Sequence, residues 1–265
     1  MYKLNYYTQL GNSLVQLSNA INVARKKKTE LILPRKADKN SSDETFRFLK
    51  NVPDFKFGDN HVGRHISKFY FNTQTFGYTL TNEERRSILQ EYVLPHVPFK
   101  KVNLNETLVI HIRSGDIFNE WVHENYVQPP LNYYKKIVEE VQPQKVIIVT
   151  QKDKSNPCIN ELLKWDSSVT VQCGTLEEDV STIMSAEKLV IGFGTWGWLL
   201  SLMSPSINSL WCPRVCTDIL DSNFDKDPFD IKRYDFPNYI KIGDWKNSED
   251  QKNIMIGDVN VIQTG

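Results

Sequence analysis

The chain has 265 residues, and its 32 basic residues (Lys and Arg) balance its 32 acidic residues (Asp and Glu). A chain of this length buries enough apolar surface to fold without disulfide bonds. Its balanced charge gives no electrostatic footprint for nucleic acid or an anionic membrane surface. The most apolar stretch, residues 189–203, is shorter than the roughly 20 residues that span a bilayer, and residues 1–7 lack the apolar run of a signal peptide. We therefore expect a soluble, cytoplasmic protein with no membrane span and no nucleic-acid partner.

The four cysteines all lie in the second half of the chain and form no C-x-x-C pair. Cys212 and Cys216 are the closest two, and the nearest histidine in sequence is His123. This spacing does not predict a zinc site, and so few cysteines suit a reducing compartment. We expect no metal site.

The first half of the chain shows alternating strand-like and helix-like patterns up to a less regular middle. In chain order we expect a strand at 3–7, a turn at 9–13, a helix with apolar residues Leu14, Leu17, Ile21 and Ala24, a strand at 29–33, and a helix from the capping-box residues Thr81 and Glu84 to Leu94. Residues 38–43 read as a loop, and the rest of 36–80 gives no clear pattern.

The second half alternates more regularly. We expect strands at 107–112, 145–150, 168–172, 188–191 and 209–212, and helices at 130–141, 156–165, 175–186 and 195–203. Five strands with four intervening helices favour a doubly wound, mostly parallel sheet. The tail is polar, with short strands expected at 239–242 and 259–262.

A polar segment at 100–106 separates the irregular part from the regular part and predicts a domain boundary. The expected organisation is an α/β fold with two halves that face each other across a cleft. The halves are an N-terminal domain at 1–104 and a C-terminal, Rossmann-like domain at 105–235. The tail at 236–265 is expected to pack back on them.

The string His111-Ile112-Arg113-Ser114-Gly115-Asp116 stands where an apolar strand ends. In open α/β sheets, ligands bind outside the carboxyl ends of the strands. An arginine there can bind a diphosphate through two parallel hydrogen bonds, and Gly115 allows a sharp turn. From this string alone, a phosphate site and an exposed Arg–Asp pair in a turn are equally good interpretations.

A glycine-rich string, Gly192-Phe193-Gly194-Thr195-Trp196-Gly197-Trp198, joins an expected strand to an expected helix. A helix N-terminus offers free N–H groups and a positive dipole to phosphate, and Thr195 adds a hydroxyl. The string also matches the dinucleotide fingerprint G-x-G-x-x-G, which keeps a nicotinamide enzyme as an alternative. It occurs late in the chain, however, and no acidic residue ends the next strand. The two tryptophans fit core packing better than a platform for a base.

Asp179 lies in the first turn of the helix expected at 175–186. An acidic residue there interacts favourably with the helix dipole. It could also orient the base or ribose of a nucleotide, or the arginine.

Three segments carry a family resemblance in order along the chain. Leu10–Gln16 resembles a G-N-x-x-x-Q segment that opens the first helix, His111–Asp116 resembles an H-x-R-x-G-D donor motif, and 179–200 resembles a late helix–strand–Ser/Thr–Trp–Trp segment. Together, over residues 10 to about 200, they resemble the GT-B-fold fucosyltransferase superfamily, which includes the α1,2-, α1,6- and protein O-fucosyltransferases.

The resemblance implies two Rossmann-like halves and an inverting, metal-independent transfer of L-fucose from GDP-fucose onto a glycan hydroxyl. It implies no cofactor beyond the donor nucleotide sugar, GDP- or UDP-linked, and a glycan acceptor as the other partner. The donor would be held by His111, Arg113, Asp179, Gly194, Thr195 and Trp196.

For catalysis the resemblance implies Arg113, Asp116 and Glu120. Arg113 would neutralise the departing diphosphate. The general base would be one of the carboxylates after the motif, Asp116, Glu120 or Glu124, with Asp116 favoured first and Glu120 second. Asn12 and Gln16 would line the cleft from the other half, on the acceptor side.

The chain departs from the family at Ser114, where members usually have a second arginine. This leaves open a UDP-sugar donor, as in a xylosyltransferase. Two other classes also stay open: an NAD-dependent oxidoreductase based on Gly192–Gly197, and a non-catalytic carbohydrate-binding protein.

Asp225-Lys226-Asp227 has the D-x-D spacing with which many metal-dependent glycosyltransferases hold Mn²⁺. It stands in a polar stretch followed by Pro228, and we interpret it as a loop. With Arg113 and a helix N-terminus available for phosphate charge, a metal is not required.

Overall fold

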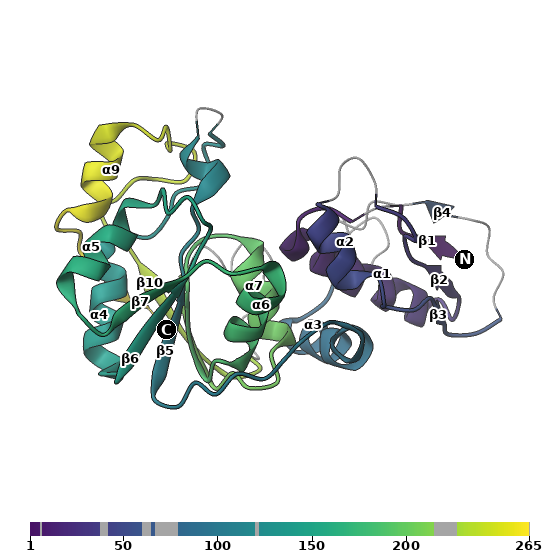
Figure 1. The fold of residues 1–265 in the computed structure, drawn as a ribbon. Coiled ribbons are helices and arrows are strands. Elements are labelled where there is room, and N and C mark those ends of the chain that lie inside the picture. Colours follow the sequence, from purple (N-terminus) through teal and green to yellow (C-terminus); the bar gives the residue numbers. More distant parts are fainter. Residues whose placement is uncertain are drawn as a thin grey trace.

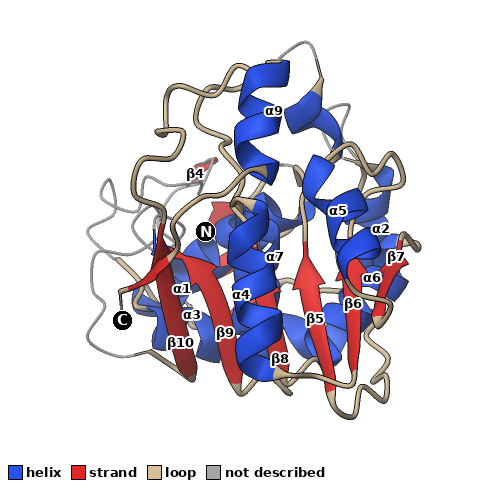
Figure 2. Cartoon of the chain, turned by 90° about the vertical axis from the view of Figure 1, so that its left-hand side faces the viewer, coloured by secondary structure: helices blue, strands red, loops and turns tan. Residues whose placement is uncertain are grey.

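A computed structural model of the chain describes residues 1–5, 7–37, 42–59, 65–66, 79–119, 122–214 and 227–264. Among these residues, the larger of two sheets has seven strands in the order β11-β10-β9-β8-β5-β6-β7 (Figure 2). Their bounds are β5 (Thr107–His111), β6 (Lys145–Val149), β7 (Val169–Gln172), β8 (Lys188–Ile191), β9 (Ser209–Pro213), β10 (Asp230–Asp235) and β11 (Ile262–Gln263).

The six strands from β5 to β10 are parallel, and β11 is antiparallel to β10. Counted from β5, the parallel strands lie in the order 3-2-1-4-5-6, which is the doubly wound arrangement, and it reverses direction between β5 and β8. Every residue of β5 is buried because the strand is covered on both faces and both edges. The expected α/β class and the five expected strands are confirmed.

Helices cover both faces of the large sheet (Figure 1). α4 (Leu131–Val141) and α5 (Pro157–Trp165) lie on one face, and α6 (Leu176–Ser185) and α7 (Thr195–Met203) lie on the other. The expected capping box opens α6, because Thr175 accepts from the Glu178 backbone and the Glu178 side chain accepts from the Thr175 backbone. In the tail, α9 (Glu249–Ile256) packs against α4 and α5.

The N-terminal part adds a small sheet and three helices beside α6 and α7 (Figure 1). The sheet has the order β3-β2-β1-β4, in which β1 pairs parallel with β2 and β4, and β3 is antiparallel. Its strands are β1 (Tyr2–Lys3), β2 (Glu30–Ile32), β3 (Phe55–Lys56) and β4 (His65–Ile66). The helices are α1 (Leu10–Lys26), α2 (Asp43–Leu49) and α3 (Asn82–Ile88), and α3 continues as a π-helical turn, Leu89–Val93, and a 3₁₀ turn, Leu94–His96.

Four expectations about elements are wrong. The strand expected at 3–7 is reduced to the two residues of β1, Tyr2–Lys3. The turn expected at 9–13 belongs to α1 from Leu10 onward. The tail has no strand at 239–242, and its last strand is shifted to Ile262–Gln263. β10 was missed because its sequence, DIKRYD, is mostly charged. Side-chain contacts hold it in place: Lys232 lies over the Trp211 ring of β9, and Arg233 forms two 2.8 Å hydrogen bonds with Asp227, just before the strand.

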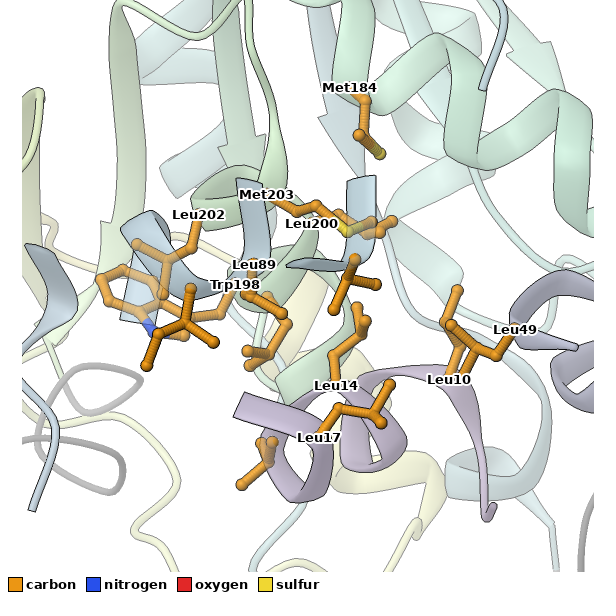
Figure 3. Close-up of a cluster of buried hydrophobic side chains, with 14 of the residues drawn as sticks. Leu10, Leu14, Leu17, Leu49, Leu89, Met184, Trp198, Leu200, Leu202 and Met203 are labelled. Atoms are coloured by element: carbon orange, nitrogen blue, oxygen red, sulfur yellow. The ribbon is translucent and has the colours of Figure 1, made fainter. Parts of the chain in front are cut away.

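One hydrophobic core crosses from the N-terminal part to the large sheet. Leu14 and Leu17 of α1 belong to the same buried cluster as Trp198 and Leu202 of α7 (Figure 3). At the far end of α7, Arg86 donates to the carbonyl oxygens of Ser201 and Leu202, where a cation suits the helix dipole. The two parts are therefore held together along the length of α7. The domain limits at residues 104 and 235 stay predictions.

Leu14→Ala tests whether this core is shared. The side chain is 0% exposed, so its truncation should lower the free energy of unfolding by about 2–5 kcal/mol. Urea denaturation followed by circular dichroism should still show a single transition. As a control, Leu163→Ala on α5 removes a side chain of a residue that is 38% exposed and should cost about 0.5 kcal/mol or less. Two separate transitions would contradict a shared core.

Candidate functional site

A cavity of about 1030 Å³ lies at the carboxyl ends of the central strands of the large sheet. Parallel pairing sets His111 beside Val149 of β6 and Ile191 of β8. The loops that follow these three strands therefore begin side by side at the same edge of the sheet. The N-terminal ends of α1 and α2 close the other side. Among the residues that line the cavity are Asn12, Arg113, Asp116, Tyr126, Gln151, Asp179, Gly194 and Thr195.

Arg113 is the central cation of this cavity. Its Nη2 donates to both carboxylate oxygens of Asp116, at 3.1 and 3.0 Å. Its guanidinium lies 4.5 Å from the centre of the Tyr126 ring, which adds a cation–π contact. Its Nη1 lies 3.5 Å from where a Cβ on Gly194 would be. The charge is therefore aimed at the glycine loop that opens α7.

Ser114 is fully buried and structural. Its Oγ accepts from the hydroxyl of Thr150 at 3.1 Å and from the backbone N–H of Asn156 at 3.2 Å. Asn156 also donates from Nδ2 to the carbonyl oxygen of Arg113, and Gln151 accepts from the Ser114 N–H at 2.6 Å. The side chain that replaces the second arginine of the family pattern thus points away from the cavity. It anchors the turn that presents Arg113 and Asp116.

His111 is neutral at physiological pH. Burial, and then the nearby charge of Arg113, lower its pKa to about 3. Its ring lies 4.6 Å from the ring of Trp196, and a Cβ on Gly197 would come within 2.9 Å of its Nδ1. His111 lines the cavity but is a poor proton acceptor, because protonation would bury a second cation beside Arg113.

Two helix N-termini meet at the cavity. Gly194, at φ +135°, begins α7 without a side-chain cap, and Gln9 begins α1 in the same way. Neither helix has an acidic residue in its first turn. The Thr195 hydroxyl donates to Asn12 Oδ1 at 2.8 Å and joins the two helices. Their uncompensated dipoles make this part of the cavity favourable for an anion.

The N-terminus of α6 has the opposite character. Glu177, Glu178 and Asp179 all lie in its first turn. Asp179 lines the cavity, and its Oδ1 accepts from Gln172 Nε2 at 2.8 Å and from the Gly174 N–H at 3.0 Å. Desolvation raises the pKa of Asp179, while these two hydrogen bonds oppose the rise. This end of the cavity suits hydroxyl and N–H donors of a ligand.

The structure brings most of the sequence-predicted residues together. His111, Arg113, Asp116, Asp179, Gly194, Thr195, Trp196 and Asn12 all line the cavity. Gln16 does not: it is 2% exposed, and its Nε2 has no acceptor among the described residues. Glu120 lies outside the described residues. Of the two tryptophans expected in the core, Trp198 is fully buried there, whereas Trp196 is only partly buried against the core and lines the cavity.

Other lining residues were not singled out as ligand-binding from the sequence. Tyr126, His123 and Asn125 come from the segment before α4, and Gln151 and Lys152 follow β6. Nothing in the sequence around Tyr126 predicted that its ring contacts the Arg113 guanidinium.

The D-x-D string does not form a metal site in the described part of the chain. Asp227 is paired with Arg233 through two hydrogen bonds of 2.8 Å, and Asp225 lies outside the described residues. Among the residues that the structure describes, no group of three or more His, Cys, Asp or Glu side chains is placed to hold a metal ion.

The chain matches no protein-family model, no curated protein and no solved structure. The fucosyltransferase resemblance therefore stays a hypothesis that depends on the site itself. No helix in the described ranges is long and apolar enough to cross a membrane.

Ser114→Ala tests the structural role of this side chain. It removes the acceptor for Thr150 and for the Asn156 N–H, and should lower the free energy of unfolding by about 1–3 kcal/mol. Thermal unfolding measures the change, with the exposed Ser167→Ala as the control, for which we expect no change. Ser114→Arg, which restores the family pattern, should destabilise more strongly because it forces a cation into a fully buried position. A stable Ser114→Arg variant would show that this interpretation of Ser114 is wrong.

The pKa of His111 predicts a pH dependence of stability. The folded pKa of about 3 lies below the ordinary value of 6.5. Between these values the unfolded chain binds a proton that the folded chain does not, so stability falls as pH falls through this window. The slope approaches about 1.4 kcal/mol per pH unit. In His111→Gln the decline should be smaller.

Urea midpoints at about pH 7 and about pH 4.5 measure this difference. His96→Gln is the matched control, because it removes a histidine that is not part of the cavity. Equal losses of stability in the wild type and in His111→Gln would contradict a buried, neutral His111.

Proposed function

We propose that the chain is a glycosyltransferase that moves a sugar from a nucleoside-diphosphate donor to a hydroxyl of a glycan, with inversion at the anomeric carbon. One observation carries the proposal. Arg113 points at the uncapped N-terminus of α7, between the ends of β5 and β8, where the strand order reverses. That is the position at which doubly wound sheets bind nucleotides.

The charges in the cavity give the donor an orientation. The diphosphate would lie between Arg113 and the first turns of α1 and α7, neither of which carries an acidic side chain. The nucleoside would extend toward α6, where Asp179 Oδ2 can accept from its hydroxyl or N–H groups. The volume of about 1030 Å³ is sufficient for a nucleotide sugar, since ligand pockets commonly measure about 300–1000 Å³.

The reaction requires one displacement. The acceptor oxygen bonds to the anomeric carbon as the bond from that carbon to the diphosphate oxygen breaks. The bonding electron pair goes to the phosphate oxygen, where Arg113 and the helix N-termini stabilise the developing charge. A general base takes the acceptor proton. Asp116 is the best-placed carboxylate, because it lines the cavity and is 63% exposed at its side chain.

The donor nucleotide is left open by the site. Guanine and uracil both carry N–H groups that can donate hydrogen bonds to a carboxylate such as that of Asp179. The buried Ser114 removes the second arginine with which the family often recognises GDP-fucose, so GDP-fucose and a UDP-sugar such as UDP-xylose are both candidates. The cations and helix dipoles of the site would supply the positive charge that stabilises the diphosphate, so the proposed reaction uses no metal ion.

Arg113→Ala should lower transfer by about 100-fold or more, because it removes the charge that stabilises the leaving group. Arg113→Lys keeps the charge but loses the two-pronged geometry, and should retain part of the activity. Lys188→Ala is the matched control: it removes an exposed cation at the opposite end of β8 and should leave transfer unchanged. All three proteins should show normal thermal unfolding.

The donor is identified by thermal shift with GDP, UDP, GDP-fucose, UDP-xylose and NAD, with and without Mn²⁺. A ligand that binds only the folded state raises the melting temperature. Stabilisation by a nucleoside diphosphate that disappears in Arg113→Ala supports the proposal. Stabilisation by NAD alone, or full transfer activity in Arg113→Ala, overturns it.

A further inference from the structure

The position of Asp116 suggests more than a general base. Both of its oxygens accept from the same nitrogen of Arg113, Nη2, at 3.1 and 3.0 Å. The other terminal nitrogen, Nη1, faces Gly194. The carboxylate therefore occupies half of the guanidinium that the proposed site offers to a phosphate.

We propose that Asp116 is an internal anion that pairs with Arg113 until the donor binds and is displaced by the diphosphate of the donor. The inference rests on the proposed function. A diphosphate that binds Arg113 through both terminal nitrogens needs Nη2, which already donates to both oxygens of Asp116, and two anions held at the same nitrogen repel each other. Donor binding then frees the Asp116 oxygens, which turn from Arg113 to the hydroxyl of the acceptor.

The backbone around Asp116 allows this exchange with little movement. Ser114 is buried, and the Gly115 N–H donates to Ser155 Oγ at 3.0 Å. Gly115, at φ +73°, forms the sharp turn. The turn is therefore anchored, while the Asp116 side chain is 63% exposed and can rotate. Displacement requires a change of side-chain rotamer and no change of fold.

The exchange is energetically easy because exposed ion pairs contribute little. A single carboxylate, largely in water, holds Arg113 weakly. A diphosphate brings more charge and also reaches the N-termini of α1 and α7. Asp116 would thus act as a competitor that weakens anion binding modestly. Its release makes the base available only after the donor is bound, which sets the order donor first, acceptor second.

The test is calorimetric titration with inorganic pyrophosphate at fixed ionic strength. Asp116→Asn removes the competing charge at nearly constant size, and should bind pyrophosphate about three- to tenfold more tightly than the wild type. Structural damage at the site would weaken binding, so a gain in affinity is specific to displacement. Transfer by Asp116→Asn should nevertheless fall, with a lower kcat at saturating donor.

Asp153→Asn is the matched control. Asp153 is exposed, follows the cavity residues Gln151 and Lys152, and does not line the cavity. It changes the charge equally and should alter the affinity for pyrophosphate by less than about twofold. Equal or weaker binding of pyrophosphate by Asp116→Asn overturns the inference.

The outcomes separate this inference from the proposed function. If pyrophosphate binding depends on Arg113 but is not tightened by Asp116→Asn, the displacement is wrong and the transferase proposal stands. If neither pyrophosphate nor any nucleoside diphosphate binds to the wild type or to Asp116→Asn, both are wrong.

Discussion

The cavity depends on one close contact between two helices that are far apart in the sequence. A Cβ on Gly11 would come within 2.6 Å of Thr195 Oγ1 and within 2.7 Å of the Trp196 backbone nitrogen. Only a residue without a side chain lets α1 approach the first turn of α7 this closely. The contact places the N-terminus of α1 beside that of α7, and both beside Arg113. Without it, the small sheet and the large sheet would share a core but would not share an anion site.

Acidic side chains at two places balance the positive groups that meet in the cavity. Asp116 pairs with Arg113 from the same loop. Farther along the cavity, the acidic first turn of α6 confines the positive potential to the α1–α7 end. A cavity that is basic at one end and acidic at the other binds a ligand with matching polarity in one orientation. A nucleotide sugar, with an anionic diphosphate and a hydroxyl-rich, N–H-bearing nucleoside, has that polarity.

Much of this arrangement was predictable because it depends on local patterns. The spacing of Leu14 and Leu17 indicated a buried helix face, the capping box of Thr175 and Glu178 indicated the start of α6, and the apolar run at 107–112 indicated a central strand. Alternating strands and helices then predicted the α/β class, and the loop positions placed Arg113 and Gly194 at the carboxyl ends of strands.

What could not be predicted depends on partners that are distant in sequence. Ser114 is buried because Thr150 and Asn156 hold it, which the H-x-R-x-G-D string does not reveal. Gln16 shares a helix face with Asn12, but one turn of α-helix, about 5.4 Å, carries it from the cavity into the core. The sequence spacing shows that the two residues share a helix face. It does not show how far along that face the cavity extends, because the packing of the whole of α1 determines this.

The tail supports one wall of the cavity from outside. The segment from Gly115 to Gln128 carries Asp116 and Tyr126 but has only one 3₁₀ turn among its described residues, so its own hydrogen bonds cannot fix it. Tyr239 donates to the carbonyl oxygen of Gln128 at 2.9 Å, and Trp245 Nε1 donates to that of Ile117 at 3.1 Å. Both hydrogen bonds are accepted by backbone carbonyl oxygens, so they do not depend on the side chains of the loop. Arg113 and Asp116 thus keep their geometry because residues more than a hundred positions later hydrogen-bond to the loop that supports them.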